Sequence, residues 1–153
     1  MTWVPEALFR KIITLVPIAC VDLLVVNREK SILLVARKNE PAIGQWWFPG
    51  GRVHYGETRI DAAKRKLKEE CGLAIFKMEE FGTYDLFFPL PEGNNSHAIT
   101  TVFVMHTTGK NVVIDSQSNA FKWYSFENWS SEVLHPFVKL ILDKFNYEQK
   151  GIK

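Results

Sequence analysis

A pair of glycines is followed, at fixed offsets, by acidic and basic residues that could hold a phosphorylated ligand with a divalent cation. The residues are Gly50, Gly51, Glu57, Arg65, Glu69, Glu70 and Gly72. Glutamate carboxylates are oxygen ligands that suit Mg²⁺, which binds one or two of them together with substrate phosphates. Glycine lets the backbone come close to a metal or diphosphate, and arginine offers a planar fork that fits phosphate oxygens. The pattern predicts a nucleoside diphosphate ligand with its metal.

The two glutamates alone would not support that prediction. On a helix they can simply form the i,i+4 pairs Arg65–Glu69 and Lys66–Glu70, which is the commonest use of charge on a helix surface. The full spacing is more specific, because six fixed residues at their average usage would match by chance with a probability on the order of 10⁻⁵. We therefore interpret the glycines, Glu57 and the charged helix as one functional unit.

A helix over residues 58–71 must position these charges, and Gly72 is expected to cap its C-terminus. At about 100° per residue the helix has an apolar side and an opposite charged side. The apolar side is expected to hold Ile60, Ala63, Leu67 and Cys71; the charged side holds Asp61, Arg65 and Glu69, with Glu70 on the flank. The apolar side should pack on a sheet and leave the glutamates facing a cleft beside the glycine loop.

The rest of the chain predicts strands interleaved with helices. The expected elements are a short amphipathic helix at about 5–14, a hairpin of buried strands at 18–26 and 32–36, a loop at 41–51, a short strand at 52–54, strands near 74–86, 98–106 and 121–125, and a final helix at about 132–145. This order indicates an α/β fold, a mixed β-sheet between α-helices. No repeat or linker divides the chain, so we expect a single domain over 1–153.

Composition excludes several classes of protein. The 153 residues are 46% hydrophobic and 24% charged, with a net charge of +2, as in ordinary soluble domains. Nineteen scattered basic residues against 17 acidic ones argue against nucleic acid as a partner. There is no secretory signal or stretch long enough to cross a membrane, and Cys20 and Cys71 lack the spacing of a metal site. We expect a cytoplasmic protein with reduced thiols and a small polar ligand.

The segment from Gly51 to Leu73 resembles the Nudix box in nearly all its defined positions, and the Nudix fold is a mixed sheet sandwiched between helices. The preceding run, Asn39 to Val53, is similar to the GDP-mannose mannosyl hydrolase branch of that superfamily, in which Asn-x-Pro-Ala-x-Gly-x-Trp precedes Pro-Gly-Gly-Arg. Asp22, Arg37 and the pair Thr100-Thr101 also match that branch. The resemblance covers roughly residues 15–125.

The resemblance implies a Mg²⁺-dependent hydrolase, with Mn²⁺ as a substitute, that converts GDP-mannose and water to GDP and mannose by attack at the anomeric carbon. It assigns the Gly50 carbonyl and Glu70 to the metal, and we add Glu69 as a third ligand. It also implies a homodimer, to which the N-terminal helix could contribute.

Further roles follow from the same resemblance. Arg37, Arg52 and Arg65 would stabilise the charge on the departing diphosphate, and Asp22 would contact the ligand or hold an arginine. Phe103 stands where the branch has a tyrosine at the substrate. Asp22 also draws attention without the family, because a carboxylate inside an apolar strand must be paired or functional.

The chain departs from the family at several positions. Lys66 replaces a glutamate that often serves as metal ligand and general base in members attacking phosphorus, yet Glu69, which the mannosyl hydrolases usually lack, is retained. Ser118 stands where that branch has its catalytic histidine, and serine alone is no base at neutral pH. The remaining candidate bases are His54, His97 and Asp115, with His106 and His135 as weaker ones.

Two alternatives therefore stay open. One is a pyrophosphatase that attacks a nucleoside diphosphate derivative at phosphorus, favoured by Glu69 and opposed by Lys66. The other is a catalytically weak nucleotide-sugar binding domain. In each case aromatic side chains could stack on the nucleobase, and the candidates are Trp46, Trp47, Phe48, Tyr84, Phe87 and Phe88.

Overall fold

The computed structural model describes residues 4–114 and 118–151, except for the side chain of residue 119. Within them the chain forms four helices and a seven-stranded sheet. The helices are α1 (Glu6–Ile12), α2 (Arg59–Cys71), α3 (Phe126–Ser130) and α4 (Pro136–Gln149). The strands are β1 (Ile18–Val26), β2 (Ile32–Arg37), β3 (Trp46–Trp47), β4 (Gly50–Arg52), β5 (Lys77–Pro89), β6 (Asn95–His106) and β7 (Ser118–Tyr124).

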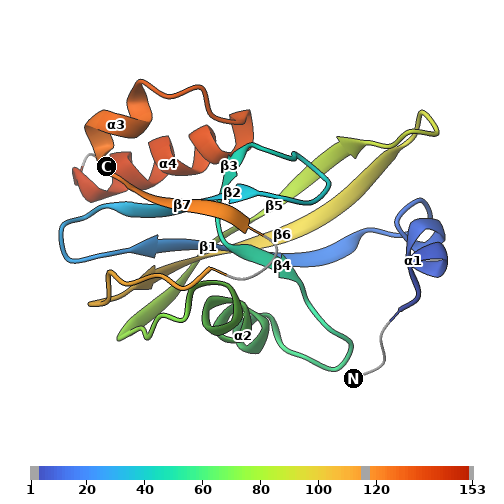
Figure 1. The fold of residues 1–153 in the computed structure, drawn as a ribbon, viewed down its shortest axis with the longest axis horizontal. Coiled ribbons are helices and arrows are strands. Elements are labelled where there is room, and N and C mark those ends of the chain that lie inside the picture. The colour runs from blue at the N-terminus through green and yellow to red at the C-terminus, as the bar shows by residue number, and fades with distance from the viewer. Residues whose placement is uncertain (1–3, 115–117, 152–153) are drawn as a thin grey trace.

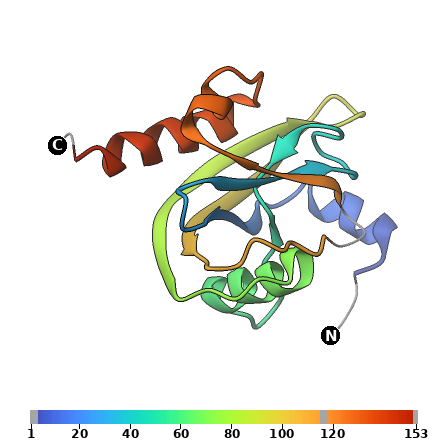
Figure 2. The same cartoon turned by 60° about the vertical axis from the view of Figure 1, so that its left-hand side comes forward.

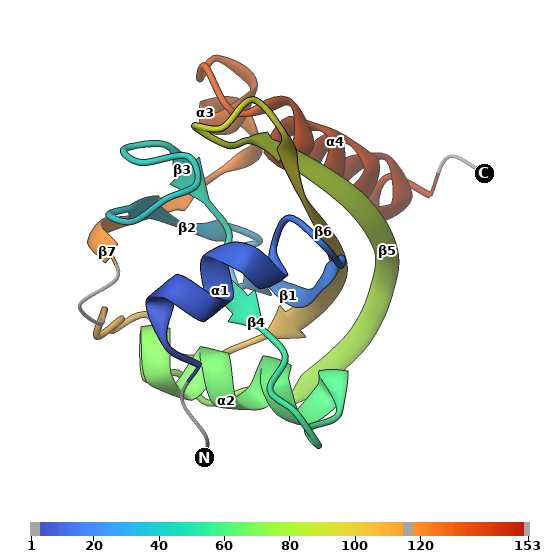
Figure 3. The same ribbon diagram turned by 90° about the vertical axis from the view of Figure 1, so that its right-hand side faces the viewer.

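The sheet lies between two layers of helices, with α2 on one side and α3 and α4 on the other (Figure 1). The view in Figure 3 shows the same layers from the end and the strong curvature of β5. Two buried clusters correspond to the two faces, because side chains alternate along each strand. Leu24 and Val26 of β1 pack with α4, whereas Val21 and Leu23 pack with α2. The predicted α/β fold, a mixed sheet between helices, is confirmed.

The strand order is β3-β2-β1-β6-β5, with β4 added to β1 and β7 added to β2. β1 and β6 run parallel, and the other pairs are antiparallel. The predicted β1–β2 hairpin pairs only at Val26 and Ile32. Further along, β1 pairs instead with β4, where Asp22 is opposite Gly50. The two hairpin strands therefore separate where the candidate site residues lie.

Gly50 makes this close pairing with β1 feasible. A Cβ atom at this position would lie 2.2 Å from the Val21 carbonyl oxygen and 3.1 Å from an Asp22 carboxylate oxygen. Any side chain would force β4 away from β1. The glycine thus places the backbone of β4 directly beside the buried carboxylate.

The caps of α2 agree with the sequence. Thr58 accepts a hydrogen bond from the Asp61 N–H (3.1 Å), and Gly72 ends the helix with φ +62°. Its buried face is rotated from the predicted one, because Ile60 is 48% exposed while Lys66 and Glu70 are buried. The assignment of Ile60 to the packed side was wrong, because the buried face includes Ala62, Lys66 and Glu70 instead.

Other boundaries differ from those predicted. α1 covers only Glu6–Ile12 of the predicted 5–14, and β5 is displaced toward the C-terminus, to Lys77–Pro89. α4 begins at Pro136 instead of residue 132, because His135 caps it by accepting from the Phe137 N–H and Pro136 occupies the first turn. Figure 2 shows α4 extending beyond the sheet toward the C-terminus. β3 and α3 were not predicted. None of the helices in the described ranges is long and apolar enough to cross a membrane.

Candidate active site

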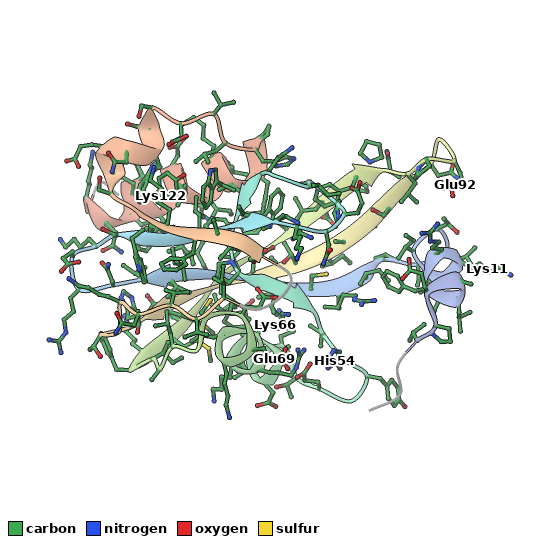
Figure 4. The ribbon with its side chains drawn as sticks, in the orientation of Figure 1. Lys11, His54, Lys66, Glu69, Glu92 and Lys122 are labelled. Carbon is green, nitrogen blue, oxygen red and sulfur yellow. The ribbon has the colours of Figure 1, made fainter. Side chains whose placement is uncertain are left out.

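Lys66 and Glu70 of α2 form a buried ion pair next to β4. Only 5% of Lys66 and 4% of Glu70 is exposed, and Lys66 Nζ contacts Glu70 Oε1. The second oxygen, Oε2, accepts a hydrogen bond from the Gly50 N–H at 3.0 Å. Lys66 Nζ also lies 3.9 Å from Glu69 Oε2, and Figure 4 shows Lys66, Glu69 and His54 in the same region where α2 faces β4. The Lys66 ammonium therefore lies beside both Glu69 and Glu70, the two carboxylates that were predicted to bind the metal.

Arg65 connects α2 to the loop that precedes it. Its Nε and Nη2 bind the two oxygens of Glu57 at 2.7 and 2.9 Å, Nη1 binds Glu69 at 3.2 Å, and Nη2 also donates to the Arg52 carbonyl at 3.1 Å. The Arg65 guanidinium is the main reason that the pKa of Glu57 falls to about 2. The fork that was predicted to bind diphosphate thus holds the glycine strand, the loop and the helix together.

Asp22 is buried on the opposite face of the sheet, toward α4. Its two carboxylate oxygens accept from Trp47 Nε1 (3.0 Å) and Thr100 Oγ1 (2.7 Å). Both donors are neutral, and burial raises the Asp22 pKa to about 6 despite them and the positive charge of Arg37. Asp22 is thus paired, but by groups that leave its charge poorly compensated.

Arg37 is influenced by the negative charges of both Asp22 and Glu70. Its Nε donates to the Pro41 carbonyl at 2.6 Å, and its guanidinium lies 5.9 Å from the centre of the Trp47 ring. Burial lowers the Arg37 pKa, and the negative charges of Asp22 and Glu70 oppose that shift. Arg37 is therefore within electrostatic range of both Asp22 and Glu70.

Arg52 is the last residue of β4 and is opposite Cys20 in the β1–β4 pair. The charges of Arg52 and Arg37 act on the Cys20 thiol, although burial, and next the Asp22 carboxylate, raise its pKa to about 12. The Phe9 ring of α1 lies on the Arg52 guanidinium, with 4.1 Å between Cζ and the ring centre. The structure thus brings together Asp22, Arg37 and Arg52.

Phe103 is not brought into this group. Its side chain is 2% exposed and packs among the apolar residues under α2, with Leu23 and Leu67. It is on the face of the sheet opposite Asp22, because their strands pair in parallel with Leu23 next to Phe103. The structure therefore gives Phe103 a place in the core, away from the predicted substrate contact.

The candidate bases lie in different places. His54 follows β4; its buried Nδ1 has no hydrogen-bond partner among the described residues and is 3.8 Å from Glu57 Oε2. His97 lies on the β5–β6 ribbon, where it bonds Asp85 at 2.7 Å and stacks on Phe87. Ser118 pairs with Arg37 in the β2–β7 ladder. Asp115 lies outside the described residues.

A hollow of about 390 Å³ lies between the loop before β3 and the turn before α4. It is lined by Gly44, Gln45, Trp46, Val133, Leu134, His135 and Pro136. Sequence reasoning named Trp46 but placed 133–136 within a helix. The sequence His135-Pro136 could have indicated where this helix begins, because proline favours the first turn of a helix. The His135 ring packs 4.8 Å from that of Trp47, which bonds Asp22, so the hollow adjoins the candidate site.

Comparison with known proteins supports the family and the fold. The family model of the NUDIX domain matches residues 17–145. The low-salt glycan biosynthesis protein Agl8 of Haloferax volcanii is 35% identical over 145 residues, covering 93% of this chain and 90% of that protein. The ADP-ribose pyrophosphatase of Methanocaldococcus jannaschii is 32% identical over 104 residues, covering 68% of this chain and 60% of that protein.

A solved structure supports the same fold. The NUDIX domain of Shewanella oneidensis NrtR, crystallised with ADP ribose, superposes with a TM-score of 0.74 at 18% identity, over 88% of this chain and 89% of that chain. Its low identity limits that comparison to the fold. The match over residues 17–145 covers most of the sequence, including the glycine strand and the charged helix. The chain is therefore a member of the Nudix hydrolase family.

Proposed function

We propose that this Nudix hydrolase acts on nucleoside diphosphate sugars with a divalent cation, and that GDP-mannose, cleaved to GDP and mannose, is the first substrate to test. The observation that carries the proposal is that Gly50 of β4 lies between Asp22 and the buried Glu70, with the charges of Arg37 and Arg52 acting in the same region. Two guanidinium groups next to carboxylates suit a diphosphate and its metal. The glycan-related name of the relative from Haloferax volcanii supports a sugar nucleotide over a simple nucleotide.

The carboxylates fit one divalent cation that also takes ligands from the substrate. Glu69, Glu70 and the Gly50 carbonyl would hold it, and Mg²⁺ commonly uses one or two carboxylates with substrate phosphates and water. In the described part of the chain no group of three or more His, Cys, Asp or Glu residues could hold a metal by itself. A bound cation would supply positive charge on the diphosphate oxygens.

The protein's own groups would then act as follows. Arg37 and Arg52 bind the diphosphate and stabilise the negative charge that develops on it as it leaves. Arg65 acts as a positioning residue, since it already binds Glu57, Glu69 and the Arg52 carbonyl. Asp22 holds the neighbouring arginines through its charge. The nucleobase would stack on Trp46 in the adjoining hollow.

His54 is our candidate for the general base. Water oxygen bonds to the anomeric carbon while its proton passes to His54, and the bond from that carbon to the diphosphate oxygen breaks with its electron pair leaving on GDP. A neutral imidazole can accept a proton from water through its free ring nitrogen. The unpartnered Nδ1 beside Glu57 supports this choice over His97, which is already bonded to Asp85.

A second candidate function is cleavage at phosphorus, as in a pyrophosphatase. It is favoured by Glu69, which lies on α2 within reach of Lys66 and Arg65, and by relatives named for that activity. Lys66 opposes it, because it removes the carboxylate that such enzymes often use as ligand and base.

Hydrolysis in ¹⁸O-labelled water separates the two functions. The purified protein would be incubated with Mg²⁺ and a panel of nucleotide sugars and dinucleoside diphosphates, and the products analysed by mass spectrometry. Label in free mannose, with GDP as the other product, supports attack at carbon. Label in a phosphate establishes the second function, while Mg²⁺-dependent binding without product indicates a nucleotide-sugar binding domain. The oligomeric state, which we expect to be a homodimer, can be measured on the same sample by light scattering.

A further inference from the structure

Lys66 is the most unusual residue of the candidate metal site. Charged side chains are rarely fully buried unless they are paired, and here both Lys66 and Glu70 are buried together against β4. The ammonium contacts Glu70 Oε1, while Glu70 Oε2 already accepts from the Gly50 N–H. Each oxygen of the main predicted metal ligand therefore has a protein donor.

Gly51 of β4 leaves space for the end of the Lys66 side chain. A Cβ atom on Gly51 would lie 2.9 Å from Lys66 Cε and 3.3 Å from Nζ. A side chain at position 51 would thus press on the end of the lysine. Gly51 gives space to the lysine, and the Gly50 N–H binds its partner Glu70, so the backbone of β4 accommodates the ion pair.

The charges at this place have a direct consequence for cation binding. Glu69 and Glu70 bring two negative charges, and Lys66 Nζ, in contact with one and 3.9 Å from the other, cancels one of them. An incoming divalent cation would meet one net negative charge and the repulsion of the nearby ammonium. That repulsion lowers the affinity of the site for a free cation.

We propose that Lys66 is a resident counter-ion of the carboxylate site: it holds Glu70 when no metal is bound, limits the site to one divalent cation, and makes that cation bind weakly until a diphosphate supplies further negative charge. Among the described residues no group of three or more acidic, histidine or cysteine side chains could hold a metal, and the carboxylate of Glu57 is bound by Arg65. The missing charge must therefore come from the ligand. This proposal rests on the metal dependence of the proposed function, but not on which bond is cleaved.

The test is a titration of the full chain with Mn²⁺, followed by electron paramagnetic resonance of the free ion, without nucleotide. Lys66→Met removes the ammonium and keeps an unbranched side chain that is one atom shorter, so we expect it to bind Mn²⁺ at least about tenfold more tightly than the wild type. Lys68→Met is the matched control, because Lys68 is exposed on the same helix and its replacement changes net charge equally. It should shift Mn²⁺ affinity by less than about twofold.

Addition of GDP gives the second half of the test. In the wild type GDP should strengthen Mn²⁺ binding strongly, whereas in Lys66→Met the gain should be much smaller. The proposal is overturned if the Lys66→Met protein binds Mn²⁺ no more tightly than the wild type, or if the Lys68→Met protein gains as much. Either result would show that the ammonium does not compete with the cation.

Folding must be checked, because Lys66→Met leaves Glu70 buried without its counter-ion and such a change destabilises proteins. Lys66→Gln retains an N–H donor for Glu70 without the charge and makes the same comparison if the methionine variant unfolds. The double variant Lys66→Met/Glu70→Gln removes both charges and should fold without the gain in Mn²⁺ affinity. Since none of these titrations requires turnover, a failure of the proposed hydrolysis would be seen separately from a failure of this inference.

Discussion

The aromatic ring of Phe9 lies on the guanidinium of Arg52, with 4.1 Å between the ring centre and Cζ. This contact joins α1, a helix with no fully buried residue, to the strand that carries the glycines. A cation–π contact of this kind contributes about 0.5–1 kcal/mol at a partly exposed site. It fixes the direction of a side chain that we assign to the diphosphate.

Phe9→Ala should therefore raise KM for the nucleotide sugar by a few-fold and leave kcat nearly unchanged, because Arg52 keeps its charge but loses its fixed orientation. Steady-state kinetics at several salt concentrations measure both values. Leu8→Ala is the control, since Leu8 is 50% exposed on the same helix. An equal effect of the two substitutions would point to α1 as a whole and not to the Phe9–Arg52 contact.

A double-mutant cycle tests whether Arg65 positions the loop or touches the substrate. If Arg65 acts through its two bonds to Glu57, Arg65→Ala, Glu57→Ala and the double variant should lose similar amounts of kcat. A coupling energy of roughly 1–3 kcal/mol is expected for groups in such a network. Additive losses would contradict the positioning role and would indicate that Arg65 contacts the diphosphate directly. Arg65→Lys should not rescue, since lysine lacks the fork.

Much of α2 could be predicted from sequence because its signals are local. Thr58 and Gly72 cap the helix as expected, and the spacing of Glu57, Arg65 and Glu70 identified the unit. The rotation of its buried face could not be predicted, because an apolar pattern favours Ile60 over Lys66. The spacing of the sequence already allowed the i,i+4 pair of Lys66 and Glu70, which the structure contains. Its burial could not be predicted, because it depends on the approach of β4.

Contacts between segments far apart in the chain were the other feature that could not be predicted from the sequence. Asp22 was recognised as unusual within an apolar strand, but its partners Trp47 and Thr100 are 25 and 78 residues away in the sequence. Likewise, the parallel pairing of β1 with β6 decides that Phe103 faces α2. A one-dimensional pattern gives no register between distant strands, so it could not separate a core phenylalanine from one at the substrate.

Asp22→Asn should separate function from stability through its pH dependence. The Asp22 pKa is about 6 in the folded protein against an ordinary value of 3.8, so the folded state holds this proton more tightly. Stability must then fall as pH rises from about 4 to about 6, by up to about 3 kcal/mol. Asparagine can still accept from Trp47 and bond Thr100, but it has no charge to bury.

Urea unfolding of the metal-free protein at pH 4 to 7.5 provides the measurement. The variant should lack this part of the pH slope and be more stable than the wild type at pH 7.5, while its hydrolytic activity falls at least about tenfold because the arginines lose a negative neighbour. Equal pH slopes in the two proteins would contradict the raised pKa. Full activity in the variant would leave Asp22 with a purely structural role.

The choice of base is tested by a pair of histidine substitutions. His54 has an unpartnered buried Nδ1 next to Glu57, whereas His97 is bonded to Asp85 on the distant ribbon. His54→Gln should lower kcat by about 10²–10⁴, the usual contribution of a general base, with little change in KM. His97→Gln should retain kcat within about twofold of the wild type. If instead His54→Gln keeps its activity, the base must come from elsewhere, and Asp115→Asn becomes the variant to measure, because this carboxylate is the remaining candidate from the sequence.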